Sequence, residues 1–165
     1  FYKKLKLLIN HGLSNRNKSQ CFGYVSRMDT LQAGILLERI KDLNTRIKAR
    51  RINANIYFQE LSKLPIKLPY ENQNEFNTYH LFVIQTKNRE KLKNFLLKKG
   101  IETGIHYPIP IHLQPAAKYL GYKKGDFQKA ETQSKTILSL PINEFLKKND
   151  IIYICKIIKI FFNEK

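Results

Sequence analysis

The stretch GIETGIHYPIPIHLQPAAKYLGY, residues 100–122, organises this chain of 165 residues. It contains two histidines, three tyrosines, three prolines and three glycines, and it shows little helical or strand periodicity. Pro108 and Pro110 fix φ and remove backbone donors, which excludes a regular α-helix through Tyr107–Ile111. The stretch is therefore expected to be a stiff, extended loop.

This loop contains three polar rings, those of His106, Tyr107 and His112. One interpretation is a binding site, because functional side chains gather on loops that a rigid body positions. The other is a proline-rich crossover whose rings pack against the body. His112 has a second interpretation of its own, as a buried ring that is satisfied by a backbone carbonyl.

The flanking sequence alternates short helices and strands. The best strand pattern is TYHLFVIQT, residues 78–86, which is rich in aromatic and β-branched residues. This alternation predicts an α/β or α+β class. The other elements that we predict are the end of a helix at 1–10, a loop at 13–20, a helix that starts at Ser26-x-x-Asp29, a break at Asp42–Asn44, and a helix to about 61. Beyond these we predict helices at 89–99, 128–136 and 143–162, a helical turn at 114–120 and a strand at 137–140.

The helix before Leu61 carries a basic face, which we interpret as a solvated surface. Its members are Arg46, Lys48, Arg50 and Arg51.

The composition gives a formal net charge of +17, which invites a nucleic-acid interpretation. The basic residues are spread along the whole chain, however, and the sequence is rich in Lys, Ile and Asn, whose codons are A/T-rich. We therefore expect weak, non-specific DNA binding and no nucleic-acid partner. No long apolar run predicts a membrane span. Cys21 and Cys155 match no metal-ligand spacing, so we expect no metal site and a reduced, cytoplasmic protein.

The first residue is Phe1, inside the amphipathic pattern FYKKLKLLI and without a preceding capping residue. This start predicts that the chain is a fragment.

Six motifs in order resemble one family: HGLSN, GYVSRMDTLQAGIL, YHLFVI, the stretch 100–122, GDFQKAE and ILSLP. The chain resembles the C-terminal part of a DegT/StrS-type sugar aminotransferase, a pyridoxal-phosphate (PLP) enzyme that aminates keto groups on nucleotide-linked sugars. The resemblance implies the aspartate-aminotransferase fold (fold type I), with residues 1–42 as the end of the large domain and 43–165 as the small α/β domain. It also implies a homodimer.

The resemblance places the Schiff-base lysine and the carboxylate that pairs with the pyridine nitrogen before the helix at which this chain begins. We therefore assign no catalytic residue and expect the chain alone to be inactive. Two positions remain for the cofactor. The family motif G-[FY]-N-x-R-x-D corresponds to Gly23–Asp29, and its Asn, which contacts the phosphate in the neighbouring subunit, is Val25 here. Arg27 is retained, either for the site or as an ion-pair partner of Asp29.

By the same resemblance, His106 and Tyr107 line the sugar pocket and His112 supports them. The segment HYPIPIHLQPA most resembles the corresponding sequence of enzymes that act on dTDP-linked 3-keto-6-deoxyhexoses. The implied function is transfer of an amino group from an amino acid, with glutamate as the expected donor, in deoxyaminosugar and polysaccharide synthesis. Two alternatives stay open: a non-catalytic relic that dimerises with an intact paralogue, and a basic nucleic-acid-binding module.

Overall fold

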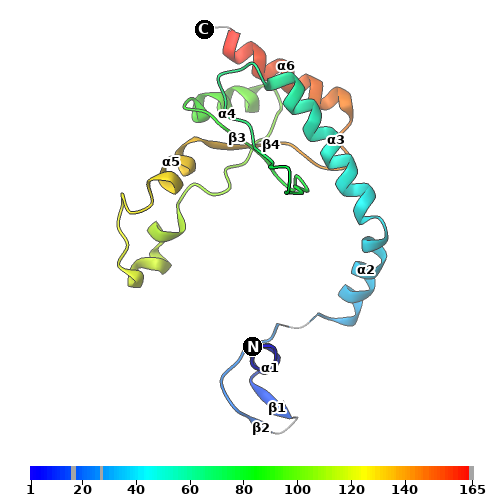
Figure 1. Ribbon diagram of the computed structural model, residues 1–165, viewed down its shortest axis with the longest axis vertical. Helices are drawn as coiled ribbons and strands as arrows, with labels where there is room; N and C mark the ends of the chain where they lie inside the picture. Colours follow the sequence, from blue (N-terminus) through cyan, green and yellow to red (C-terminus); the bar gives the residue numbers. More distant parts are fainter. Residues whose placement is uncertain (16–17, 27, 164–165) are drawn as a thin grey trace. The chain divides into compact units, whose positions relative to one another are not determined.

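The computed structural model describes residues 1–15, 18–26 and 28–163. The chain divides into two compact units, Phe1–Leu43 and Asn44–Lys165, and each is described here by itself. Figure 1 shows the element order along the chain.

In the first unit, helix α1 (Tyr2–Leu8) is followed by a two-stranded antiparallel hairpin of β1 (Leu13–Asn15) and β2 (Lys18–Ser19). The loop predicted over 13–20 is therefore wrong: the polar side chains are exposed, but the backbone pairs. Gly23 is needed where the chain returns past α1, because a Cβ there would lie 2.4 Å from the nitrogen of Gly12.

Helix α2 (Thr30–Lys41) begins one residue after Asp29, whose backbone N–H donates to the Gln32 side chain at 3.2 Å. This Asp29–Gln32 pair, rather than the predicted Ser26–Asp29 pair, marks the helix start. None of the 12 residues of α2, all of which the structure describes, is buried. The helix ends at Asp42, as predicted.

The second unit is built around β3 (Phe82–Gln85) and β4 (Ile137–Leu140), which pair antiparallel with Phe82 opposite Leu140. Single bridges extend this sheet on both sides, Lys67 beside Gln85 and Gly104 beside Ser139. The predicted strand at 78–86 is too long, because the chain turns at Tyr79, whose φ is +48°.

Helices α3 (Leu43–Leu61), α4 (Arg89–Lys98) and α6 (Lys148–Asn163) lie to one side of this pair of strands in Figure 1 and share one hydrophobic core with it. The Tyr57 ring of α3 stacks on Phe82 with ring centroids 4.7 Å apart, and its hydroxyl donates to the Pro141 carbonyl at 2.7 Å. Helix α6 is shorter than the predicted 143–162, since Asn143 forms a side-chain-capped turn before it. The fully buried apolar residues include Ala54, Tyr57, Leu61, Phe82, Ile84, Leu92, Leu96, Leu138, Ile151 and Ile158.

The remaining elements carry the loop of interest: the 3-10 turns η1 (Ile111–Leu113) and η2 (Pro115–Leu120), then α5 (Gln128–Thr136). The bounds of α5 and β4 agree with the sequence prediction. The short η1 turn lies inside the stretch that was expected to be extended.

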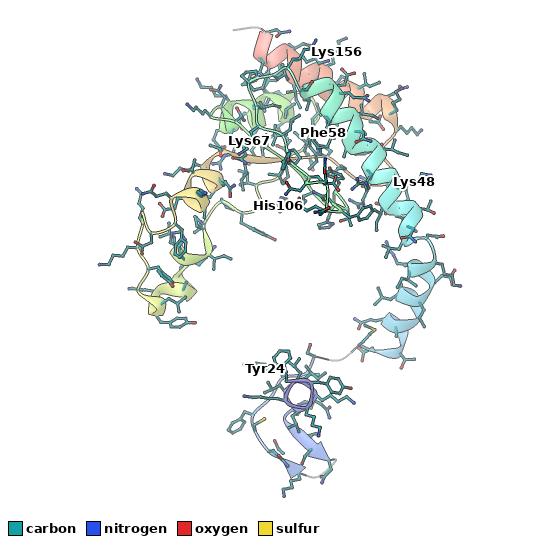
Figure 2. All side chains as sticks on the ribbon, viewed as in Figure 1. Tyr24, Lys48, Phe58, Lys67, His106 and Lys156 are labelled. Carbon is teal, nitrogen blue, oxygen red and sulfur yellow. The ribbon has the colours of Figure 1, made fainter. Side chains whose placement is uncertain are left out.

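The basic face of α3 is not the solvated surface that we predicted. Arg46 and Arg50 both form ion pairs with Glu144, at 3.1 and 2.7 Å, and all three side chains are at most 30% exposed. Arg51 pairs with Glu71 at 2.7 Å. These arginines hold loops of the second unit against α3, and only Lys48 of the predicted set is exposed (Figure 2).

Candidate functional site

His106 is held at the edge of the sheet by Ser139 of β4. Its Nδ1 lies 2.9 Å from the Ser139 hydroxyl, and Gly104, two residues earlier, pairs with the same Ser139 through both backbone groups, at 3.1 and 2.7 Å. Figure 2 shows His106 close to the two strands. The imidazole is therefore fixed at one nitrogen although the residue as a whole is exposed.

Gly104 leaves the space that the His106 ring occupies. A Cβ at position 104 would lie 2.5 Å from Cε1 of this ring and 3.2 Å from Nδ1. The shorter of these distances is not found in real contacts, so the His106 ring would have to shift if any larger residue replaced Gly104. The glycine and the serine thus act together on one side chain.

Tyr107 is exposed to 74%, and its ring meets the edge of His106 with centroids 5.6 Å apart. Within the part of the chain that the structure describes, its hydroxyl has no hydrogen-bond partner. The phenol is thus free to bind a ligand, since it can both donate and accept a hydrogen bond.

His112 has a different environment. Its Nε2 lies 3.1 Å from Glu131, and the two side chains are only 8% and 11% exposed. Glu131 also accepts a 2.7 Å hydrogen bond from the Gly125 backbone. This hydrogen bond and the one from His112 lower the pKa of the Glu131 carboxyl below its ordinary value, although burial acts in the opposite direction. The Phe127 ring packs on His112 at 4.7 Å. The His112 ring thus connects the η1 turn to α5 and has a structural role there.

His106, Tyr107 and His112 all line one open pocket of about 490 Å³. A pocket of this size, with apolar walls and a few polar groups, is typical of small-molecule sites. Its walls come from the loop, η1, the end of η2, the link to α5, α5 itself and the start of β4. The lining residues are His106, Tyr107, Ile109, Pro110, Ile111, His112, Leu120, Tyr122, Phe127, Ala130, Gln133, Ser134 and Ile137.

The candidate cofactor residues lie in the first unit. Val25 is 64% exposed, and its backbone pairs with Asn10. Its isopropyl side chain offers no donor to a phosphate. Arg27 lies outside the described residues. The described part of this segment therefore does not fit a PLP phosphate at position 25.

Other site classes find no support among the described residues. In 1–15, 18–26 and 28–163 no three His, Cys, Asp or Glu side chains gather as metal ligands. No helix within these same ranges has both the length and the apolar character that a membrane crossing requires. Cys21 and Cys155 are both free.

Two site residues, Ser139 and Glu131, were missed by sequence reasoning. Ser139 is the only polar residue of the strand ILSL, which was a usable signal, because a hydroxyl between buried neighbours needs a partner. Glu131 gave no such signal, since a glutamate on a short helix is usually solvated.

Comparison with known proteins agrees with this architecture. The crystal structure of DesV from S. venezuelae in complex with a ketimine intermediate superimposes with a TM-score of 0.89 at 30% identity, over 97% of this chain and 43% of that chain. A DegT/DnrJ/EryC1/StrS aminotransferase from Brucella abortus superimposes with a TM-score of 0.86, again at 30% identity, over 97% of this chain and 43% of that chain. The fold is thus that of part of a PLP-dependent sugar aminotransferase, which confirms the predicted class.

The sequence relatives lead to the same conclusion. The dTDP-3-amino-3,4,6-trideoxy-alpha-D-glucose transaminase of Streptomyces venezuelae is 33% identical over 147 residues, which cover 88% of this chain and 39% of that protein. The erythromycin biosynthesis sensory transduction protein EryC1 of Saccharopolyspora erythraea is 35% identical, over 88% of this chain and 40% of that protein. The profile of the DegT/DnrJ/EryC1/StrS aminotransferase family matches residues 1–159. The chain belongs to this family, and it spans about two fifths of the length of these relatives.

Proposed function

We propose that the chain is the C-terminal segment of a PLP-dependent aminotransferase that transfers an amino group from an amino acid to a keto-sugar nucleotide. Glutamate is the proposed donor, and a dTDP-linked 3-keto-6-deoxyhexose the proposed acceptor. The setting is cytoplasmic deoxyaminosugar synthesis for a polysaccharide, and the full-length protein acts as a homodimer. Residues 1–42 belong to its large domain and 43–165 to its small domain. The names of two relatives, both transaminases of dTDP-aminosugars, support this substrate class.

The pocket carries this proposal. A sugar ring presents apolar C–H faces together with hydroxyl groups, so a site for it combines apolar walls with a few hydrogen-bonding groups. The pocket has such walls, in Ile109, Ile111 and Phe127, and the polar rings of His106 and Tyr107 line it as well. In this assignment His106 and Tyr107 contact the sugar nucleotide, and His112 supports the wall against which it lies.

PLP supplies the electron sink for amino transfer when it is bound. In this proposal the described residues of this chain do not complete its site, and Val25 supports this because its side chain has no donor for the phosphate. The proposal therefore requires that the Schiff-base lysine and the carboxylate that pairs with the ring nitrogen come from further sequence.

A ligand titration tests the pocket. dTDP-glucose is added to isotope-labelled chain, and the ring signals of His106 and Tyr107 are followed by NMR. We expect saturable shifts at both rings and none at Tyr119, which is 85% exposed and does not line the pocket. The variant His106→Gln should weaken binding. Shifts confined to Tyr119 and other surface rings, or no shifts, would contradict the proposal.

A cofactor experiment tests the requirement for further sequence. The purified chain is mixed with PLP and reduced with borohydride, and labelled lysines are mapped by mass spectrometry. We expect scattered, low labelling and no turnover of a keto-sugar nucleotide. One stoichiometrically labelled lysine together with transamination would show instead that this chain forms a cofactor site of its own.

A second candidate function is a non-catalytic partner that dimerises with an intact relative. The observation in its favour is the set of exposed apolar residues in the first unit, among them Phe22, Val25, Met28 and Leu31. Sedimentation of the chain alone and with a full-length relative distinguishes the two functions: a stable mixed complex without ligand binding in the pocket supports this alternative.

A further inference from the structure

Among the described residues, the Ser139 hydroxyl has a single hydrogen-bond partner. The residue is 5% exposed, and its backbone N–H and carbonyl are both paired with Gly104. Within the described part of the chain, its hydroxyl oxygen contacts a single polar side-chain atom, Nδ1 of His106 at 2.9 Å. A buried hydroxyl that fails to donate its hydrogen loses free energy, so the arrangement in which this hydrogen points to Nδ1 is the favoured one.

This contact decides where the imidazole carries its own hydrogen. In a neutral histidine one ring nitrogen donates and the other accepts. If Nδ1 accepts from Ser139, then Nε2 carries the hydrogen. Among the described residues Nε2 of His106 has no hydrogen-bond partner, and the residue lines the pocket. Its N–H group is therefore available to a ligand.

We propose that Ser139 is a positioning residue that holds His106 as the Nε2–H tautomer, so that His106 meets its ligand as a hydrogen-bond donor. The ligand atom that this group recognises is an oxygen acceptor, namely a hydroxyl, carbonyl or phosphate oxygen. The neutral ring held in this way does not serve as a base at Nε2, because that nitrogen already carries a hydrogen. The identity of the ligand rests on the proposed function, whereas the tautomer does not.

Gly104 also restricts the position of the ring. Its φ lies outside the left-handed region, so alanine can adopt the same backbone conformation. The added Cβ would, however, meet Cε1 at 2.5 Å. Gly104→Ala therefore moves the ring away from Ser139 while Ser139 itself stays unchanged, which provides a second, independent way to break the contact.

The test is a measurement of histidine tautomers by long-range ¹⁵N–¹H NMR on the full chain without ligand. The chain has four histidines, so the spectrum is simple, and the loss of one ring in His106→Gln assigns His106. We expect His106 to be wholly in the Nε2–H form, with a nuclear Overhauser contact from its Hε1 to the Gly104 α-protons. Exposed His80 provides the reference for a solvated ring that exchanges between tautomers.

In Ser139→Ala and in Gly104→Ala, the His106 signals should move to the tautomer mixture of His80, and the Overhauser contact should be lost. Ser139→Thr keeps the hydroxyl and should retain the wild-type signals. The signals of His112, which is bound to Glu131, should not change in any variant. If one alanine variant does not fold, the other still gives the answer.

Two results would overturn the proposal: an Nδ1–H ring in the wild-type chain, or a tautomer mixture like that of His80 before any substitution. Unchanged His106 signals in both alanine variants would overturn the role of Ser139 as well. Because these measurements use no ligand, they are separate from the dTDP-glucose titration. An Nε2–H ring in a chain that does not bind the nucleotide sugar would overturn the proposed function and leave the positioning role of Ser139 in place.

Discussion

Helices α2 and α6 differ in burial, although both carry apolar side chains and α6 has the more strongly apolar face. Both carry leucine or isoleucine at helical spacing, yet α2 buries none of its 12 described residues, whereas α6 buries five. The five are Ile151, Ile154, Cys155, Ile157 and Ile158. The strands and helices of the second unit cover this face of α6. Periodicity along the sequence defines which face of a helix is apolar. That face adds to the free energy of unfolding only where neighbouring elements bury it.

The largest expected contrast is in hydrogen exchange. Amides of α6, such as that of Ile158, should open only with global unfolding, which for a domain of this size costs about 5–15 kcal/mol. Amides of α2, such as that of Ile35, should exchange with an opening free energy near zero, because no buried side chain holds the helix. Exchange followed by mass spectrometry on peptides from both helices measures the difference. Equal protection of α2 would show that its apolar face is covered in solution.

The next contrast compares two leucines. Leu92→Ala removes a fully buried side chain in α4 and should lower the free energy of unfolding by about 2–5 kcal/mol. Leu36→Ala in α2 removes a side chain that is 50% exposed and should change it by less than about 0.5 kcal/mol. Urea unfolding monitored by circular dichroism gives both values. A large loss in the free energy of unfolding in Leu36→Ala would show that the apolar face of α2 is buried in solution.

A polar contact inside the second unit is expected to have a smaller effect. The buried Asn53 side chain donates to the carbonyls of Asn143 and Leu146, at 2.9 and 3.2 Å. Asn53→Ala leaves both carbonyls without this donor and should cost about 1–3 kcal/mol. The matched control is Asn55→Ala, two residues along the same helix at an exposed position. The same urea series should show no comparable loss for the control.

Acid should weaken the second unit through Glu71. Hydrogen bonds from Arg51 and from the Asn77 backbone lower the pKa of this carboxyl from 4.5 to about 2. A carboxyl whose folded pKa is lowered contributes stability fully above its unfolded pKa, near 4.5, and loses that contribution as the pH falls towards 2. Glu71→Gln should therefore flatten the fall in melting temperature between these pH values. Glu38→Gln, at an exposed ion pair in α2, should leave that fall as steep as in the wild type.

The smallest effect on stability is expected in the pocket. Tyr107 belongs to the second unit but is 74% exposed. Tyr107→Phe should therefore change the free energy of unfolding by less than about 0.5 kcal/mol while weakening the binding of dTDP-glucose. Thermal unfolding and the NMR titration separate these outcomes. Lost stability with unchanged binding would show that the loop is a packed crossover and not a site.

Local sequence patterns predicted those helices and strands whose first and last residues are marked by apolar spacing or by a proline. The bounds of α5 and β4 and the end of α3 agree with the structure, because apolar spacing and Pro141 define them within a few residues. The strand predicted at 78–86 failed at Tyr79, whose hydroxyl donates to Glu71 at 2.9 Å and whose backbone turns out of the strand. That partner lies outside the pattern, so no propensity could indicate the turn.

The sequence by itself determined the family, the mixed α/β class, and the presentation of His106 and Tyr107 on a proline-stiffened loop. It could do so because motif order, apolar spacing and proline geometry act over short distances along the chain. Only the tertiary structure decided how charges and rings are paired. Arg50 meets Glu144 and His106 meets Ser139, contacts across 94 and 33 residues, and both depend on which segments the packed core brings together.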